Sequence, residues 1–327
     1  MLSHTLQEDG ELEVAGVCAT AEEAIALLPR LRPDLVTMDV ELPGMSGMEA
    51  VEQIMDAHPV PIVVLSSHVD GNSELAAAAL AAGALDAVGK QDFAFTSPGD
   101  PAAAAFRARL KLLSTARVIR HPRARLNRRG PRLAAPARAA AVIGLCASTG
   151  GPHALAAALA ALPASFPIPI LVVQHIARGF SEGLARWLDG AIAPSVRIAS
   201  EMPKAAPGVW IAPEGAHLVY GEGRALRLDR APAQGPHQPS ADVLFKSVAA
   251  NAGRLGVGVV FTGMGRDGAE GVAAIRRAGG LTVAQDEASC AIFGMPRAAA
   301  EKGAETILSP GAIGELLHEL RSAERIA

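Results

Sequence analysis

Three polar residues in the second half of the chain have the side chains that nucleophilic catalysis needs, and each follows a short apolar run. They are Ser148, His175 and Asp267, after the apolar runs 141–143, 168–173 and 257–261. Continuous apolar runs are typical of buried parallel strands, and parallel strands end at one edge of their sheet, where ligands bind. Ser, His and Asp gathered at such an edge would form a catalytic triad, which is recognised by the roles of its members and not by their order.

The sequence around Ser148 places this hydroxyl between the end of a strand and the start of a helix. Pro152 is tolerated in a first helical turn, and the alanine-rich residues 153–162 predict the helix. Unpaired N–H groups and the helix dipole there favour developing negative charge. The simpler interpretation is a helix N-cap serine beside a tight turn. A dinucleotide-binding loop does not fit, because the glycines do not match G-x-G-x-x-G and the next strand ends in Gln174-His175 instead of an acid.

The other two residues also have non-catalytic interpretations. Taken alone, His175 is a sheet-edge histidine and Asp267 is a turn residue before Gly268. The three strand ends taken together favour the triad. The remaining histidines nearby, His153, His217 and His237, are interpreted as surface or loop residues.

The composition indicates two domains and excludes several classes of protein. The chain has 327 residues, of which 50% are hydrophobic and 3% aromatic, and its net charge is −3. This charge excludes a strongly basic nucleic-acid-binding protein, and no run approaches the ~20 apolar residues of a membrane span. The three cysteines, at positions 18, 146 and 290, have no paired or metal-like spacing, so they fit buried small hydrophobes in a reducing cytoplasm. No signal peptide is expected, because charged residues interrupt the beginning of the chain.

The first hundred residues alternate between strand and helix patterns, which predicts a parallel, doubly wound sheet. The expected strands are 12–17, 34–39, 61–67 and 84–89, and the expected helices are 20–31, 47–58 and 73–82. Thr20 and Glu23 form a capping-box pattern at the start of the first of these helices.

Residues 33–47 resemble the phosphoacceptor segment of response-regulator receiver domains. The resemblance implies that Asp39 is phosphorylated, that Ser66 is the hydroxyl of the fourth strand, and that Lys90 pairs with the phosphoryl group. It also implies a histidine kinase as phosphodonor and Mg²⁺ as the cofactor of phosphorylation in a complete domain. Gln91 departs from the family, which usually has proline after the lysine.

A larger departure from the receiver pattern lies upstream. Receiver domains begin with an apolar strand that ends in two Mg²⁺-binding acids, whereas Glu8-Asp9 follows no apolar run and is expected in a solvated loop. We therefore expect a flavodoxin-like receiver without its first strand, which is central in the strand order 2-1-3-4-5. Of the Mg²⁺ ligands, only Asp39 is then expected. Either the start codon is placed too late or the domain is incomplete.

Residues 101–138 contain eleven Lys and Arg residues and no acidic one. The part up to about residue 119 can continue the last receiver helix, and the prolines and glycine beyond it break regular structure. A basic run raises the possibility of nucleic-acid binding. We favour a solvated hinge, because no aromatic residues are interleaved. The predicted domains are therefore 1–100, a linker at 101–138, and 139–327.

Strand and helix patterns alternate again from residue 139. The expected strands are 196–198, 209–212 and 281–284 with a hairpin at 218–228, and the expected helices are 179–188, 240–248, 268–277 and one from 294. Together with the three apolar runs described first, they predict a Rossmann-like, three-layer α/β domain with a mostly parallel sheet.

This second domain closely resembles the catalytic domain of CheB-type protein-glutamate methylesterases over residues 139–320. Five motifs in the same order carry the resemblance, at 144–151, 172–176, 239–245, 262–269 and 284–296. Gln238 stands where the family commonly has arginine. The resemblance assigns Ser148 as nucleophile, His175 as base and Asp267 as orienting acid, with backbone N–H groups near Thr149 and Met264 as candidates for the oxyanion site.

The resemblance also implies the reaction and its partners. It implies hydrolysis of glutamyl γ-methyl esters, and deamidation of certain glutamines, on the cytoplasmic helices of chemoreceptors. No cofactor is expected for the esterase, and the location implied is the cytoplasm. One rival hypothesis is a signalling module that docks on receptors or kinases without chemistry, against which an intact triad argues. Another is a general esterase. The chain lacks the G-x-S-x-G elbow usual in such enzymes, because Cys146, between Leu145 and Ala147, stands where the motif needs a glycine.

Overall fold

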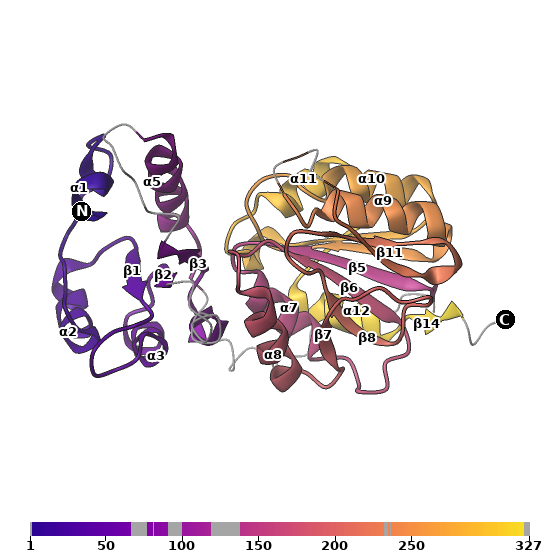
Figure 1. Cartoon of the computed structure of the whole chain (residues 1–327), viewed down its shortest axis with the longest axis horizontal. Coiled ribbons are helices and arrows are strands. Elements are labelled where there is room, and N and C mark those ends of the chain that lie inside the picture. Colours follow the sequence, from indigo (N-terminus) through magenta and orange to yellow (C-terminus); the bar gives the residue numbers. More distant parts are fainter. Residues whose placement is uncertain are drawn as a thin grey trace. The chain divides into compact units, whose positions relative to one another are not determined.

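The computed structural model describes residues 2–66, 77–80, 82–90, 100–118, 138–231, 235 and 237–323. The chain forms two compact units, shown in Figure 1, and each is described by itself. Both are built from parallel sheets with helices, as the sequence predicts. Among the described residues, no helix has both the length and the apolar character needed to cross a membrane. The predicted boundaries at residues 100 and 138 stay predictions.

The amino-terminal unit contains a three-stranded parallel sheet in the order β1-β2-β3. Its elements are α1 (Leu2–Gln7), α2 (Ala21–Leu31), β1 (Val36–Asp39), α3 (Gly47–Ala57), β2 (Ile62–Ser66), β3 (Asp86–Gly89) and α5 (Pro101–Ser114). Every residue of the central strand β2 is buried, as its unbroken apolar run predicts. Residues 77–80 and 82 are helical, and the rest of the helix expected at 73–82 lies outside the described residues.

Helices α2 and α3 of this unit begin at side-chain caps. The Thr20 hydroxyl accepts a hydrogen bond from the Glu23 N–H, and the Glu23 carboxylate accepts from the Ala19 N–H. Ser46 and Glu49 form a full capping box at the start of α3. Each cap satisfies N–H groups that the first helical turn leaves without a partner.

Two expectations for this unit are wrong. Residues 12–18 form no strand, and Val17 is 75% exposed. A strand needs a hydrogen-bonded neighbour, and within the described residues β1 pairs only with β2. The helix expected to reach residue 119 ends at Ser114, where the Thr115 hydroxyl donates to the Leu112 carbonyl. Residues 119–137 lie outside the described part of the chain.

The acidic pair Glu8-Asp9 is exposed at a turn, as expected, but it has a partner that the sequence did not indicate. The buried Arg107 guanidinium donates to both carboxylates, each at 2.8 Å, and to the Thr5 carbonyl at 3.0 Å. Burial of a charge is costly unless it is paired. The pair therefore ties α1 to α5 by satisfying a buried cation.

The carboxyl-terminal unit is a three-layer α/β structure. Its main sheet has seven parallel strands, in the order β13-β12-β11-β5-β6-β8-β7. The strands are β5 (Val142–Ala147), β6 (Pro169–Gln174), β7 (Val196–Ile198), β8 (Gly208–Ile211), β11 (Gly256–Val260), β12 (Leu281–Gln285) and β13 (Thr306–Leu308). A hairpin of β9 (His217–Tyr220) and β10 (Leu226–Asp229) and a short pair of β4 (Ala139–Ala140) with β14 (Arg321–Ser322) complete it.

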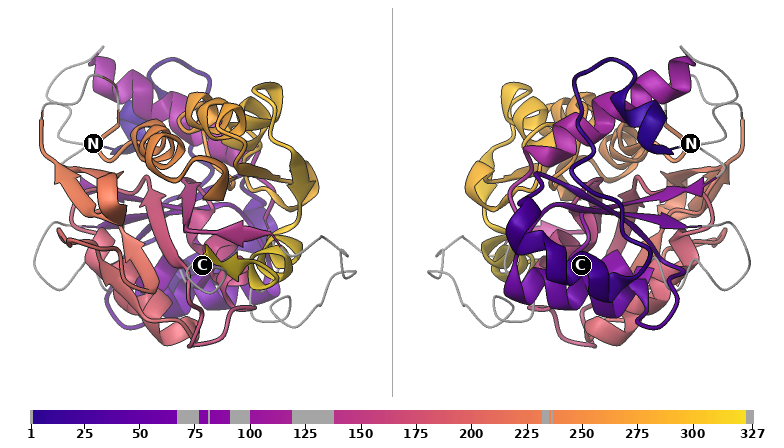
Figure 2. Two further views of the ribbon diagram at one scale, coloured as in Figure 1. Left: turned by 90° about the vertical axis from the view of Figure 1, so that its right-hand side faces the viewer. Right: turned by 90° about the vertical axis from the view of Figure 1, so that its left-hand side faces the viewer.

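Helices cover both faces of the seven-stranded sheet (Figure 1). One group is α9 (Ala241–Ala252), α10 (Ala269–Arg277) and α11 (Met295–Glu301), and the other is α7 (Gly151–Leu159), α8 (Ser181–Ala191) and α12 (Pro310–His318). Figure 2 shows the strands between the orange helices and those of the opposite layer. Two apolar cores fill the spaces between the layers. With few aromatic residues, these cores consist mainly of Ala, Val, Leu and Ile.

Candidate active site

The register of β5 and β6 brings Ser148 and His175 side by side. Ala147 pairs with Gln174 as the last residues of these neighbouring parallel strands, so the next residue on each is Ser148 and His175. The His175 N–H donates to the Ala147 carbonyl at 2.9 Å. The Gln174 side chain donates to the carbonyls of both Ser148 and His175, each at 2.8 Å. The strand ends are therefore held together by a backbone hydrogen bond and by the Gln174 side chain.

The loop after β11 closes the other side of Ser148. The Ser148 N–H donates to the Thr262 carbonyl at 3.0 Å, and the Thr262 hydroxyl donates to the Thr149 carbonyl at 3.0 Å. This loop runs on to Asp267, just before α10. The three predicted residues thus come from three neighbouring strands at the carboxyl edge of the sheet, where ligands bind in folds of this kind.

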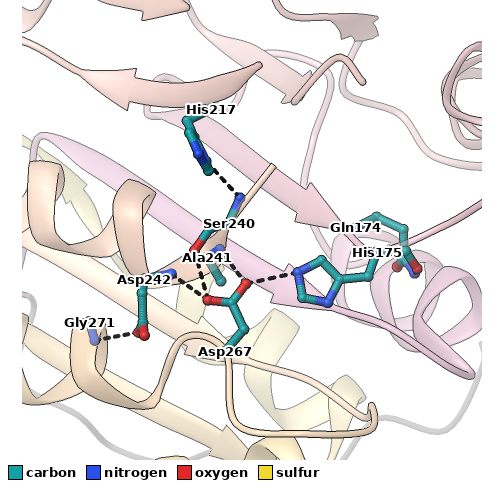
Figure 3. Close-up of polar contacts among 8 residues, drawn as sticks. All are labelled: Gln174, His175, His217, Ser240, Ala241, Asp242, Asp267 and Gly271. Carbon is teal, nitrogen blue, oxygen red and sulfur yellow. Dashed lines mark hydrogen bonds and ion pairs between the residues drawn. The ribbon is translucent and has the colours of Figure 1, made fainter. Parts of the chain in front are cut away.

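His175 and Asp267 form a direct hydrogen bond (Figure 3). His175 Nε2 lies 2.8 Å from Asp267 Oδ2, and the two side chains are 12% and 8% exposed. A carboxylate accepts only, so Nε2 carries the hydrogen in this pair. The other ring nitrogen, Nδ1, is then the one able to accept a proton.

The Asp267 carboxylate is also held by the start of helix α9 (Figure 3). Ser240 Oγ donates to Oδ1 at 2.9 Å, and the N–H groups of Ala241 and Asp242 donate to Oδ2 at 2.7 Å and to Oδ1 at 3.0 Å. Burial opposes ionisation of Asp267, but the hydrogen bonds from His175 and from this backbone outweigh it and hold its pKa well below the usual range. The carboxylate is therefore charged at neutral pH.

Gly263 allows the backbone to pass close to Ser148. A Cβ at this position would lie 2.6 Å from Ser148 Cβ and 2.5 Å from Met295 Sδ. The Gly263 carbonyl in turn accepts from the N–H groups of Gly294 and Met295. The motif around Gly263 is therefore needed for close packing against Ser148, independently of Asp267 at its end.

The two oxyanion candidates lie on either side of this contact. Thr149 is buried and follows Ser148 directly, while Met264 is half-buried and follows Gly263. Within the described part of the chain, neither backbone N–H donates to a protein acceptor. Donors of this kind are what an oxyanion site requires. Their assignment stays a prediction.

Two histidines have contacts that the sequence did not indicate. His217 is buried, and its Nδ1 accepts from the Ser240 N–H at 3.1 Å. His237 stacks on His175, with ring centroids 4.2 Å apart and an angle of 15° between the rings. His217 therefore lies in strand β9 and not on the surface or in a loop, whereas His237 lies in a loop, as expected, but packs on the candidate base. The position of His237, two residues before the matched motif at 239–245, was the only signal in the sequence.

The structure also shows the surroundings of Gln238, the three cysteines and His153. Gln238, the departure from the family, donates through its side chain to the Ala231 carbonyl at 2.8 Å and so holds its own loop. Cys146 and Cys290 are buried as expected, and burial, followed by the charges of Asp267 and Asp242, raises the pKa of the Cys146 thiol well above its ordinary value. Cys18 is only half-buried, because the segment around it forms no strand. His153 lies beside Trp187, with ring centroids 6.2 Å apart.

In the amino-terminal unit, the predicted switch residues gather at the carboxyl edge of the three-stranded sheet. Lys90 Nζ lies 2.6 Å from Asp39 Oδ2 and 4.0 Å from Glu41 Oε2. Ser66 is the last residue of β2, between the strands that carry Asp39 and precede Lys90, and it is buried. A lysine at this distance from an aspartate can balance the charge of a phosphoryl group on it.

The acids around Asp39 do not fit a complete Mg²⁺ site. Mg²⁺ is held by oxygen ligands in near-octahedral geometry, usually with carboxylates among them. In the portion of the chain that the structure describes, no three His, Cys, Asp or Glu side chains are grouped so that they could hold a metal ion. Asp39 is engaged by Lys90 instead. We therefore derive no step through a metal at this position.

Each of the two units matches a known protein family. The family model described as CheB methylesterase matches residues 143–317, more than half of the chain, and the response regulator receiver domain model matches residues 1–94. A solved structure of the Thermotoga maritima CheB methylesterase catalytic domain is 33% identical, with a TM-score of 0.53; the match covers 55% of this chain and 98% of that one. The fold and these matches thus define a hydrolase with an α/β catalytic domain and a receiver domain.

Full-length relatives are also similar. A protein-glutamate methylesterase/protein-glutamine glutaminase of Anaeromyxobacter dehalogenans is 45% identical over 97% of this chain and 94% of its own length. One of Myxococcus xanthus is 42% identical over 99% and 93%. The chain belongs to the CheB family of protein-glutamate methylesterases/protein-glutamine glutaminases, and it is a hydrolase of the chemotaxis system.

Proposed function

We propose that the chain hydrolyses glutamyl γ-methyl esters, and deamidates specific glutamines, on the cytoplasmic domains of chemoreceptors by a triad of Ser148, His175 and Asp267. The observation that carries the proposal is the part-buried 2.8 Å bond between His175 and Asp267, directly beside Ser148 at the strand ends. A nucleophile, a base within reach and a third group that orients the base are the parts that acyl transfer requires.

The first half of the reaction acylates Ser148. Its Oγ attacks the ester carbonyl carbon, while His175 Nδ1 takes the hydroxyl proton and Asp267 balances the imidazolium. The Thr149 and Met264 N–H groups are the candidate donors to the oxyanion, and each such donor lowers the barrier by about 3 kcal/mol. The carbon–oxygen bond to the methoxy group then breaks, and His175 gives its proton to the departing methanol. For a glutamine side chain, the carbon–nitrogen bond breaks and the leaving group is ammonia.

The second half releases glutamate. Water attacks the carbonyl carbon of the acyl-enzyme, His175 takes a proton from this water, and the bond to Ser148 Oγ breaks. The proton on His175 returns to Ser148, and the carboxylic acid formed on the substrate releases its own proton to solvent and becomes a glutamate carboxylate. No cofactor enters these steps, because the carbonyl is activated by hydrogen bonds and the nucleophile by a base.

We further propose that phosphorylation of Asp39 by a histidine kinase regulates this activity. The pairing of Asp39 with Lys90 at 2.6 Å and the nearby buried hydroxyl of Ser66 support it. A phosphoryl group adds charge and acceptor oxygens that a lysine and a hydroxyl can bind, which shifts the local structure. In the absence of phosphate, the receiver is expected to restrain the catalytic domain.

The test is methanol release from a methylated chemoreceptor cytoplasmic fragment. Ser148→Ala is expected to lower kcat by about 10⁶-fold, that is, to the background of the assay, because triad members act as a unit. Ser195→Ala is the matched control, since Ser195 is exposed just before β7, and it should match the wild type. Turnover by Ser148→Ala above about a tenth of the wild-type rate would show that the nucleophile is wrong.

A further inference from the structure

The imidazole of His237 lies flat against the imidazole of His175. The ring centroids are 4.2 Å apart and the planes differ by 15°, so one face of the candidate base is covered by a second ring. His237 belongs to the connection between β10 and α9, and nothing in the triad chemistry requires a residue there. A stacked ring pair of this geometry is a specific contact and needs an explanation.

The residues that follow His237 are anchored. Gln238 donates to the Ala231 carbonyl at 2.8 Å. The Ser240 N–H donates to His217 Nδ1 at 3.1 Å, and the Ser240 hydroxyl donates to Asp267 at 2.9 Å. Because these positions are tied to three different groups, the backbone that follows the His237 ring is held in place without any substrate.

Residues 237–242, here called the clamp segment, contact both partners of the His–Asp pair. The ring of His237 covers His175, and the hydroxyl of Ser240 with the N–H groups of Ala241 and Asp242 binds the Asp267 carboxylate. The hydrogen bond to Asp267 fixes the position of His175 Nε2 but leaves the ring free to rotate about that bond. The stack fixes the plane of the ring. Together the two contacts fix the direction of Nδ1.

We propose that His237 is a positioning residue, which holds the plane of His175 so that Nδ1 points to Ser148 while Nε2 stays on Asp267. The inference rests on the proposed function of the triad and extends it to a residue outside the triad that packs on its base. Misplacement of a catalytic group by about 1 Å can cost 10²-fold in rate, so a support of this kind has a measurable effect.

The electrostatics of His237 agree with this role. Burial lowers the pKa of His237, and the neighbouring His175 lowers it further, against the opposing effect of Asp267. A neutral His237 does not repel the imidazolium that His175 becomes during the reaction. It presents a ring face to that cation, which is an attractive arrangement.

The experiment compares His237→Ala, which removes the stack, with His237→Phe, which keeps a flat ring but has no nitrogen. His318→Ala, an exposed histidine at the end of α12, is the control. Methanol release from a methylated chemoreceptor fragment gives kcat and KM for the full chain. ¹⁵N spectra of the histidine rings report, without any turnover, whether the hydrogen of His175 stays on Nε2.

We expect His237→Ala to lower kcat by about ten- to a hundredfold with KM within about twofold, and to mix the two tautomers of His175. His237→Phe should stay within about threefold of the wild-type kcat and keep the Nε2–H tautomer. The proposal is overturned if His237→Ala keeps the wild-type kcat and tautomer, or if His237→Phe is as impaired as His237→Ala. Activity in Ser148→Ala would instead contradict the triad, so the two failures are distinguishable.

Discussion

Asp267 is bonded at both carboxylate oxygens, to the ring of His175 on one side and to the first turn of α9 on the other. The same side chain therefore orients the candidate base and caps a helix. An anion at a helix N-terminus is stabilised by the unpaired N–H groups and by the helix dipole. Loss of its charge should affect both the activity and the stability of the carboxyl-terminal unit.

Asp267→Asn is expected to lower kcat by about 10³- to 10⁴-fold, because an amide in this place favours the wrong tautomer of the histidine. It should also lower the free energy of unfolding at pH 7 by about 2 kcal/mol, because charge-assisted hydrogen bonds are replaced by neutral ones. Methanol release and urea unfolding of the purified variant measure the two effects.

The stability effect of Asp267 should depend on pH in a definite direction. Its folded-state pKa lies below the value of about 4 for a free aspartate. Its contribution to stability is therefore fully present above about pH 4 and is lost as the pH falls through the folded-state pKa. The gap between the wild type and Asp267→Asn should thus be constant from pH 7 to 5 and narrow below pH 4. A gap that widens in acid would contradict the assignment of an ionised Asp267.

At this scale the sequence predicted Ser148, His175 and Asp267 because each lies in a long motif next to an apolar run. It did not predict the stack of His237 or the bond from Ser240 to His217. Both depend on the path of the connection between β10 and α9, and local sequence patterns do not encode the path of an irregular segment.

Among the elements, the loop after β11 has a tight geometric requirement at Gly263, directly beside the candidate nucleophile. The Cβ of an alanine there would meet both Ser148 and Met295 at less than 3 Å, and neither the strand end nor the start of α11 can move freely. Gly263→Ala should therefore displace Ser148 and lower kcat by about 10²-fold. Methanol release measures the loss, and circular dichroism verifies the fold.

Gly190→Ala is the matched control for that substitution. Gly190 lies inside helix α8, and an added Cβ would meet nothing within 4 Å. Alanine also has the higher helix propensity, by about 1 kcal/mol, so this variant should keep full activity and gain slightly in stability. If both glycine variants lose activity equally, or if neither does, close packing of Gly263 on Ser148 is not what places the nucleophile.

The elements that the sequence predicted best are those buried on both faces. Strand β5 leads to Ser148, strand β6 leads to His175, and β2 is the central strand of the other unit. Each contains a continuous apolar run and is buried throughout. The strand expected at 12–17 had apolar residues at positions 12, 14 and 17 but no hydrogen-bonded neighbour among the described residues. Strand formation is a property of a pair, which explains why a local pattern predicted it wrongly.

On the scale of the whole molecule, the proposed restraint predicts that the catalytic domain works faster without the receiver. The solved Thermotoga maritima relative is a catalytic domain by itself, so a fragment from Ala139 onwards is a reasonable folding unit. This fragment should release methanol faster than the full, unphosphorylated chain at equal concentration. Equal rates would remove inhibition by the receiver from the proposal.

The response of the full chain to a phosphodonor depends on charge around Asp39. Phosphoryl transfer brings a dianionic group against this carboxylate, and Mg²⁺ with its acidic ligands offsets the repulsion. In the described part of the chain, Lys90 and Glu41 are the charged groups paired around Asp39, and no set of three acids is grouped there.

We therefore expect weak labelling of Asp39 and little change in methanol release when the full chain is incubated with Mg²⁺ and a small phosphodonor. Asp39→Asn gives the background of the labelling. Stoichiometric labelling of the wild type, with a clear rise in activity, would contradict this expectation and show that further acidic ligands come from outside the described residues.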